Sequence, residues 1–146
     1  MKTTIYNSKL AKLILFSGYS TIMLFGFILT KLSELRPSTI RHEQTHQRQY
    51  VECMILSLPV ALPLCLFVSW WFILLIPTFY YLLYLGEWLV SFIYHLFSDD
   101  RIGDGKVNHN AYAAGAMEME AKLNQDNPNY LNERKSFAWF GYYGRI

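Results

Sequence analysis

Charge is scarce in this chain of 146 residues. Only 16% of the residues are charged, whereas 53% are hydrophobic and 17% are aromatic, and the net charge is +2. So small a net charge gives no electrostatic case for binding nucleic acid. The length suggests a single domain. The apolar fraction is too high and too clustered for an ordinary small soluble domain, which favours a membrane protein.

Cysteine and strand patterns are also sparse. The two cysteines, Cys53 and Cys65, both lie in apolar sequence, where such residues usually act as small buried hydrophobic side chains. They therefore do not indicate a redox compartment. No internal repeat or low-complexity run is visible. We expect an all-α integral membrane protein with about three membrane-embedded helices, in one domain over residues 1–146.

The first apolar run, LILFSGYSTIMLFGFIL at 13–29, follows three lysines. It has the form of a signal sequence, but no small-residue cleavage site follows it. The run therefore predicts a retained anchor helix at about 11–30. Four polar residues weaken the hydropathy and leave open a buried or interfacial helix. These are Ser17, Tyr19, Ser20 and Thr21.

The second apolar region covers residues 53–97, and its first 34 residues contain no charge and no histidine. As one helix it would reach roughly 68 Å, against a hydrocarbon core of about 30 Å. We therefore predict two antiparallel spans at about 53–70 and 72–97, in a bacterial cell membrane. The turn is expected near Ser69-Trp70-Trp71, because tryptophan favours the interface. The basic residues around the first span leave the orientation open. Three prolines are expected to kink or break these helices: Pro59, Pro63 and Pro77.

Polar sequence follows the apolar region. Residues 98–110, SDDRIGDGKVNHN, have the composition of a loop. A helical pattern then extends over about 112–124. Asn127-Pro128 provides a helix cap and first turn, which predicts a C-terminal helix at about 128–143.

The most informative motif is H-E-Q-T-H, at the beginning of a helix predicted at about 39–57. His42 and His46 are one helical turn apart and point the same way. Both imidazoles can therefore reach one ion, and Zn²⁺ in catalytic sites takes three protein ligands and a water. Glu43 stands beside the open position and can accept a proton from that water. The alternative is a polar amphipathic helix at the membrane surface. A single-faced stripe of His42, His46, Gln49 and Cys53 argues against it.

A third ligand must come from elsewhere in the chain, because no G-x-x-H follows the motif. In AYAAGAMEMEAKLNQ, Glu118 and Glu120 point about 200° apart on a helix, so only one can bind the ion. We favour Glu118, which begins an E-x-x-A pattern, and keep Glu120 as the alternative. Two crossings of the membrane return the chain to the side it left, as this site requires.

With H-E-x-x-H followed by a downstream E-x-x-A glutamate, the sequence resembles the gluzincin metallopeptidases, whose membrane members include the CAAX-type prenyl proteases. More narrowly, HEQTHQRQYVE, AYAAGAMEMEA and YLNERKSFAWFGYY resemble a group of short H-E-x-x-H proteins of Bacteroides-like bacteria. The resemblance implies His42 and His46 as ligands, Glu43 as general base, and Glu118 or Glu120 as third ligand. It departs at Lys122, where membrane gluzincins often have aspartate. The edge strand by which gluzincins often hold substrate is expected to be missing.

The sequence thus predicts a membrane-bound zinc metallopeptidase that acts on a peptide or a membrane-proximal protein segment. A non-catalytic membrane protein with a structural metal site is the alternative. Glu87 interrupts the apolar hairpin, where a carboxylate is usually functional. It is expected to orient a ligand histidine, to receive a substrate amine, to lie at the headgroup level, or to pair with Arg134. Three further residues are weighed as oxyanion donors: His95, His109 and Tyr112.

Overall fold

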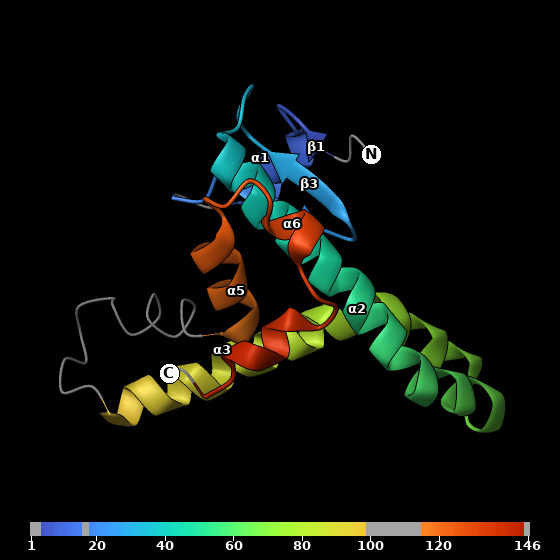
Figure 1. Ribbon diagram of the computed structural model, residues 1–146. Coiled ribbons are helices and arrows are strands. Elements are labelled where there is room, and N and C mark those ends of the chain that lie inside the picture. Colours follow the sequence, from blue (N-terminus) through green and yellow to red (C-terminus); the bar gives the residue numbers. More distant parts are fainter. Residues whose placement is uncertain (1–3, 16–17, 99–114, 145–146) are drawn as a thin grey trace.

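The computed structural model describes residues 4–15, 18–98 and 115–144, and their fold is mostly helical with one small sheet (Figure 1). The described elements follow one another as β1 (Thr4–Ile5), α1 (Lys9–Ile14), β2 (Thr21–Leu24), β3 (Phe27–Thr30), α2 (Pro37–Phe67), the 3₁₀ helix η1 (Trp70–Leu74), α3 (Leu75–Ser98), α5 (Ala116–Asn124), α6 (Tyr130–Glu133) and the 3₁₀ helix η2 (Ala138–Tyr142). The expectation of an all-α fold is therefore corrected.

The predicted anchor helix at 11–30 is wrong, because this region forms a short helix and a β-hairpin. Strand β3 lies between β1, which is parallel to it, and β2, which is antiparallel to it. Phe25 and Gly26 form the two-residue turn with φ of 48° and 81°, the signs of a type I′ turn. The helix was predicted from hydropathy, which depends only on how many residues of the run are apolar. The β-branched and aromatic residues of the run, separated by glycines, favour strands instead.

The predicted site helix at 39–57 and the beginning of the predicted span at 53–70 form one continuous helix, α2. Pro59 and Pro63 lie inside it without ending it. The chain turns back at Ser69, as expected, and η1 and α3 form the returning arm over the predicted span at 72–97. The hairpin is therefore confirmed as a helical structure, whereas the prolines do not break it.

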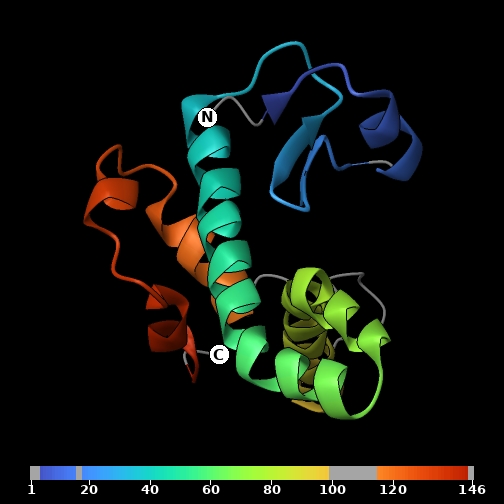
Figure 2. The ribbon, with the colours of Figure 1, turned by 90° about the vertical axis from the view of Figure 1, so that its right-hand side faces the viewer.

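Helix α2 is the central element of the fold. In Figure 2 the sheet and α3 lie on one side of α2, and α5 with the C-terminal segment lies on the other. The buried core between them is built around Tyr50 and Cys53 of α2, Tyr80 of α3, Met117 of α5 and Trp139 of η2. The fold thus brings α3 and α5, which lie on either side of residues 99–114 in the sequence, against the same turns of α2.

The predicted C-terminal helix at 128–143 is also corrected, because the chain leaves the helix at Arg134. Here the backbone is extended, and Phe137 has a positive φ of 58°. Two hydrogen bonds to Glu52 accompany this interruption, from the Phe137 N–H at 2.9 Å and the Trp139 indole at 3.0 Å. The contacts with α2 therefore override the local helical preference of this segment.

Two helices are long and apolar enough to cross a membrane, Pro37–Phe67 and Trp70–Tyr94. Only 28% and 6% of their most apolar stretches are buried inside the molecule. A core helix of a soluble protein would be mostly buried. The hairpin tip exposes large apolar side chains, among them Leu66, Phe67, Trp70 and Trp71, and projects from the body in Figure 1.

Candidate metal centre

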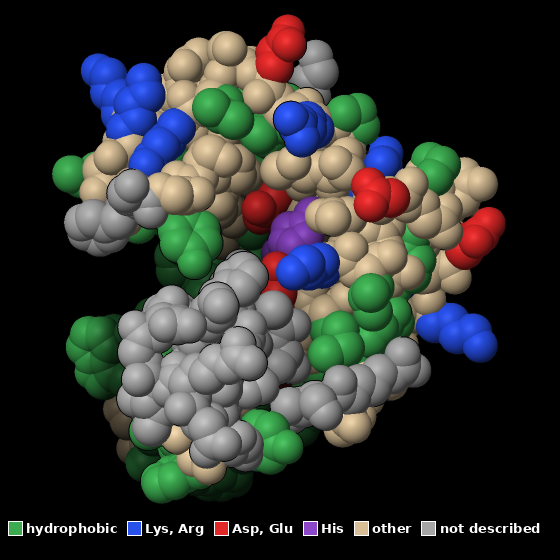
Figure 3. All heavy atoms as spheres, turned by 90° about the vertical axis from the view of Figure 1, so that its left-hand side faces the viewer, with side chains coloured by type: hydrophobic (Ala, Val, Ile, Leu, Met, Phe, Trp, Pro, Cys, Tyr) green, Lys and Arg blue, Asp and Glu red, His purple; other side chains and the backbone are tan. Residues whose placement is uncertain are grey.

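Three potential ligands converge where α5 packs against α2. His42 and His46 lie one turn apart on α2, with their Nε2 atoms 3.2 Å from each other. The Glu118 carboxylate is 3.5 Å from the His42 Nε2 and 3.3 Å from the His46 Nε2. One ligand atom from each residue lies within 4.8 Å of the others, so this group could hold a metal ion. Histidine (purple) and acidic (red) side chains lie side by side in a recess of the surface in Figure 3.

The structure places the two candidate glutamates on different sides of α5. Glu118 faces the histidines. Glu120 is fully buried and accepts hydrogen bonds from the Arg134 guanidinium and the Tyr130 hydroxyl, the latter at 2.8 Å. This is the opposition that the two-residue spacing predicts for a helix. Glu118 is therefore the glutamate whose position suits a third ligand.

Gln49, one turn beyond His46, fixes which nitrogen of His46 carries the proton. Its amide N–H groups donate to the Met117 carbonyl at 2.9 Å and to Glu120 at 3.1 Å. The amide oxygen must then face His46 Nδ1, 2.8 Å away, which acts as the donor. A neutral His46 consequently keeps its Nε2 lone pair free on the side of His42 and Glu118, as a metal ligand requires.

Two tyrosines of α3 complete the surroundings of the ligands. The Tyr80 hydroxyl is 3.2 Å from His46 Nδ1, and the Tyr84 hydroxyl donates to Glu118 Oε2 at 3.1 Å. Sequence reasoning missed both, although their spacing of one helical turn gives them a common face. The two tyrosines did not stand out because the surrounding helix is apolar. A tyrosine stripe in such a helix more often contributes to packing than to a metal site.

Glu43 lies at the edge of a cavity of about 310 Å³, which His42, His46 and Tyr84 also line. Three residues of β2 form another wall of this cavity: Thr21, Ile22 and Met23. Glu43 hydrogen-bonds with the Met23 backbone. The predicted general base therefore lines the same space as both candidate histidine ligands, and this space is large enough for part of a substrate.

The pKa values of Glu118 and Arg134 are both shifted in the direction that keeps these groups charged. Burial alone would raise the pKa of Glu118, but its interactions with the His46 and His42 imidazoles and with the Tyr84 hydroxyl outweigh burial, so its pKa lies below the usual value. Behind the site, burial works against the charge of Arg134, yet Glu52 and Glu120 raise its pKa above the usual value. Both groups therefore stay charged near neutral pH.

The remaining sequence candidates divide into three groups. Arg134, weighed as a partner of Glu87, instead forms ion pairs with Glu52 and Glu120. Glu87 pairs with Tyr143 and the start of α5 rather than with Arg134. His109 and Tyr112 lie outside the described residues, as does the side chain of His95.

Compared with models of known protein families, with curated proteins and with solved structures, the chain matches none of them. What the structure adds to the motif is geometric: the spacing of His42 and His46 suits an H-x-x-x-H site, and Glu118 joins them.

Proposed function

We propose that this protein is a membrane-bound zinc metallopeptidase of the gluzincin type, with His42, His46 and Glu118 as ligands and Glu43 as general base. The observation that carries the proposal is the convergence of three ligand atoms from two helices separated in sequence by the apolar hairpin. The donor set of two imidazoles and one carboxylate is one that catalytic zinc sites use.

The residues around the ligands suit hydrolysis. When bound, zinc supplies a Lewis acid for a peptide carbonyl and lowers the pKa of a water. Glu43 takes up the proton of the attacking water, because its carboxylate lines the same cavity as both histidines. Its hydrogen bond with the Met23 backbone restrains the carboxylate at this edge. A structural site would have no use for such a base.

Strand β2 supplies the surface that holds an extended substrate. It is an edge strand of the sheet, so no other described strand pairs with the second side of its backbone. The Lys31 N–H donates to the Ser20 carbonyl at 2.9 Å, and the alternation of an antiparallel pair then turns the backbone N–H and C=O groups of Thr21 and Met23 away from β3. The Met23 backbone already hydrogen-bonds with Glu43, so Thr21 is the residue whose backbone is left for a substrate strand. A peptide can add to this edge as a further strand. The expectation that an edge strand is missing is therefore corrected.

The proposed setting is a membrane, entered by the hairpin of α2 and α3. Both arms are apolar, and little of their most apolar stretches is buried in the protein. The hairpin returns to the side it left, which keeps both halves of the metal site together. A substrate close to the membrane, such as a peptide or a protein segment near the bilayer, fits this placement.

The decisive experiment compares Glu43→Gln with Glu133→Gln, an exposed acid on α6. Both variants and the native chain are purified in detergent, their zinc content is measured, and cleavage of a quenched-fluorescent peptide library is followed. We expect Glu43→Gln to keep its zinc and lose about 10²- to 10⁴-fold in cleavage rate. Glu133→Gln should cleave like the native chain.

Two results would contradict the proposal in different ways. Zinc held by four protein ligands, with no cleavage by any form, would support a structural metal site. Failure of the native chain to bind zinc, with no loss of stability on chelation, would remove the metal centre altogether.

A further inference from the structure

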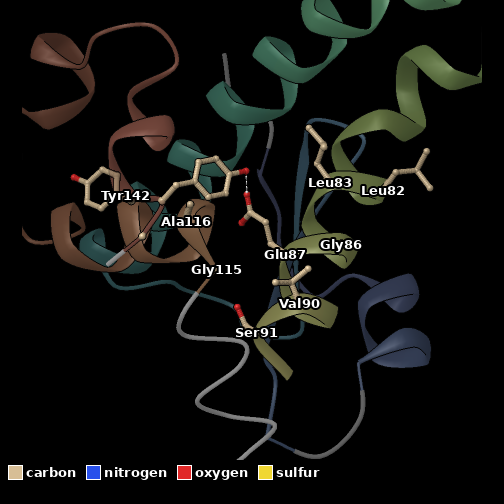
Figure 4. A pocket seen from close by; sticks show the side chains of 11 residues that line it. Leu82, Leu83, Gly86, Glu87, Val90, Ser91, Gly115, Ala116 and Tyr142 are labelled. Atoms are coloured by element: carbon tan, nitrogen blue, oxygen red, sulfur yellow. Dashed lines mark hydrogen bonds between the residues drawn. The ribbon is translucent and has the colours of Figure 1, made fainter. Parts of the chain in front are cut away.

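Glu87 of α3 contacts the N-terminus of α5, the helix that carries Glu118. Its Oε2 accepts a hydrogen bond from the Met117 N–H at 3.2 Å, and it also hydrogen-bonds with the Ala116 backbone. Figure 4 shows the Glu87 side chain between α3 and the beginning of α5. The residue that follows Met117 is Glu118.

Helix α5 lacks a cap of its own. The first N–H groups of an α-helix have no acceptor within the helix. The N-cap residue here is Gly115, which has no side chain to accept them. A carboxylate at this end also interacts favourably with the helix dipole. Glu87 therefore supplies from α3 what a capping serine or aspartate supplies locally.

The Glu87 carboxylate is itself held in place. Its Oε1 accepts a hydrogen bond from the Tyr143 hydroxyl, so the two oxygens bind different segments. The cavity of about 300 Å³ beside it is lined mainly by apolar residues, including Leu82, Leu83 and Val90. The carboxylate consequently joins α3, the first turn of α5 and the C-terminal segment.

We propose that Glu87 is a positioning residue that keeps Glu118 within reach of His42 and His46 by fixing the first turn of α5. This role rests on the proposed metal site but not on peptidase activity. Glu118 is the third residue of a helix of nine, so a displacement of that first turn moves its carboxylate directly. Glu87 itself touches neither histidine through a hydrogen bond that the described residues show.

The test measures zinc affinity of the full chain in detergent by competition with a chromogenic chelator. We expect Glu87→Ala to weaken zinc binding about 10-fold, in the range found for residues that orient metal ligands. Glu87→Gln, which keeps one acceptor oxygen for the α5 N–H groups, should restore part of the loss. Ser91→Ala is the matched control, because Ser91 lines the same cavity one helical turn further along α3.

A double-mutant cycle separates positioning from general damage to the fold. If Glu87 acts through Glu118, adding Glu87→Ala to Glu118→Ala should cause no further loss of zinc affinity. Full additivity of the two losses, or native affinity in Glu87→Ala, would overturn the positioning role and leave the proposed function intact. A native chain that binds no zinc would overturn both, whereas zinc binding without cleavage would count against the peptidase alone.

Discussion

Among single residues, Gln49 shows how a helical stripe becomes part of a candidate metal centre. The sequence placed Gln49 on the same face as both histidines, and that placement is confirmed. The spacing could not reveal the acceptors that orient its amide, since the Met117 carbonyl and Glu120 belong to another helix. The sequence therefore predicted no partner for this side chain, which the structure shows to be fully buried.

Removal of the Gln49 amide should weaken zinc binding without removing a ligand. In Gln49→Ala, His46 loses the acceptor that keeps the proton on Nδ1, so we expect about 10- to 100-fold lower zinc affinity. The control is Gln47→Ala, two positions earlier on α2. The Gln47 amide donates instead to the Gly26 carbonyl in the turn of the β2–β3 hairpin. Native affinity in Gln49→Ala would mean that the Tyr80 hydroxyl alone fixes the tautomer.

At the scale of elements, strand β2 is the element that the sequence interpretation did not predict. Apolar residues at 13–29 were counted as one helix, and the turn at Phe25-Gly26 was not recognised. The Phe25 N–H donates to the Tyr81 hydroxyl at 2.6 Å, and its ring packs against that of Tyr81. The β2–β3 hairpin is therefore held against α3 by contacts that no local sequence pattern predicts.

Proline substitutions in β2 distinguish its free edge from its paired edge. Thr21 points its N–H away from β3, so Thr21→Pro should fold normally but raise KM for peptides about tenfold, by removing a donor for the substrate strand. Ile22 points its N–H towards β3, so Ile22→Pro should lower the stability instead. Chemical denaturation and cleavage kinetics of both variants provide the measurement. Equal KM in Thr21→Pro and the native chain would exclude strand addition at this position.

For the whole molecule, Arg134 joins three separate segments of the chain. From the C-terminal segment it forms ion pairs with Glu52 of α2 and Glu120 of α5. Glu120 in turn accepts from Gln49, which contacts His46. The described part of the C-terminal segment adds no residue to the candidate metal centre, yet the charge of Arg134 balances two buried carboxylates behind it.

Loss of this charge should destabilise the protein strongly. Arg134→Met leaves Glu52 and Glu120 buried without their cation, so we expect the free energy of unfolding to fall by about 3–5 kcal/mol. Arg48→Met changes an exposed arginine of α2 and should be nearly neutral. Denaturant titration followed by tryptophan fluorescence measures both. A loss near that of the control would contradict the inference that Arg134 balances the charge of these two carboxylates.

The sequence by itself determined what depends on short spacing and on composition. It placed His42, His46 and Glu43 on one turn of helix, predicted that an apolar hairpin follows, and reduced the third ligand to two glutamates with opposite directions. The tertiary structure decided which glutamate faces the histidines, which side chains orient them, and that a strand rather than a helix borders the cavity. These outcomes depend on contacts between segments far apart in the chain, and such contacts leave no periodic trace in either segment alone.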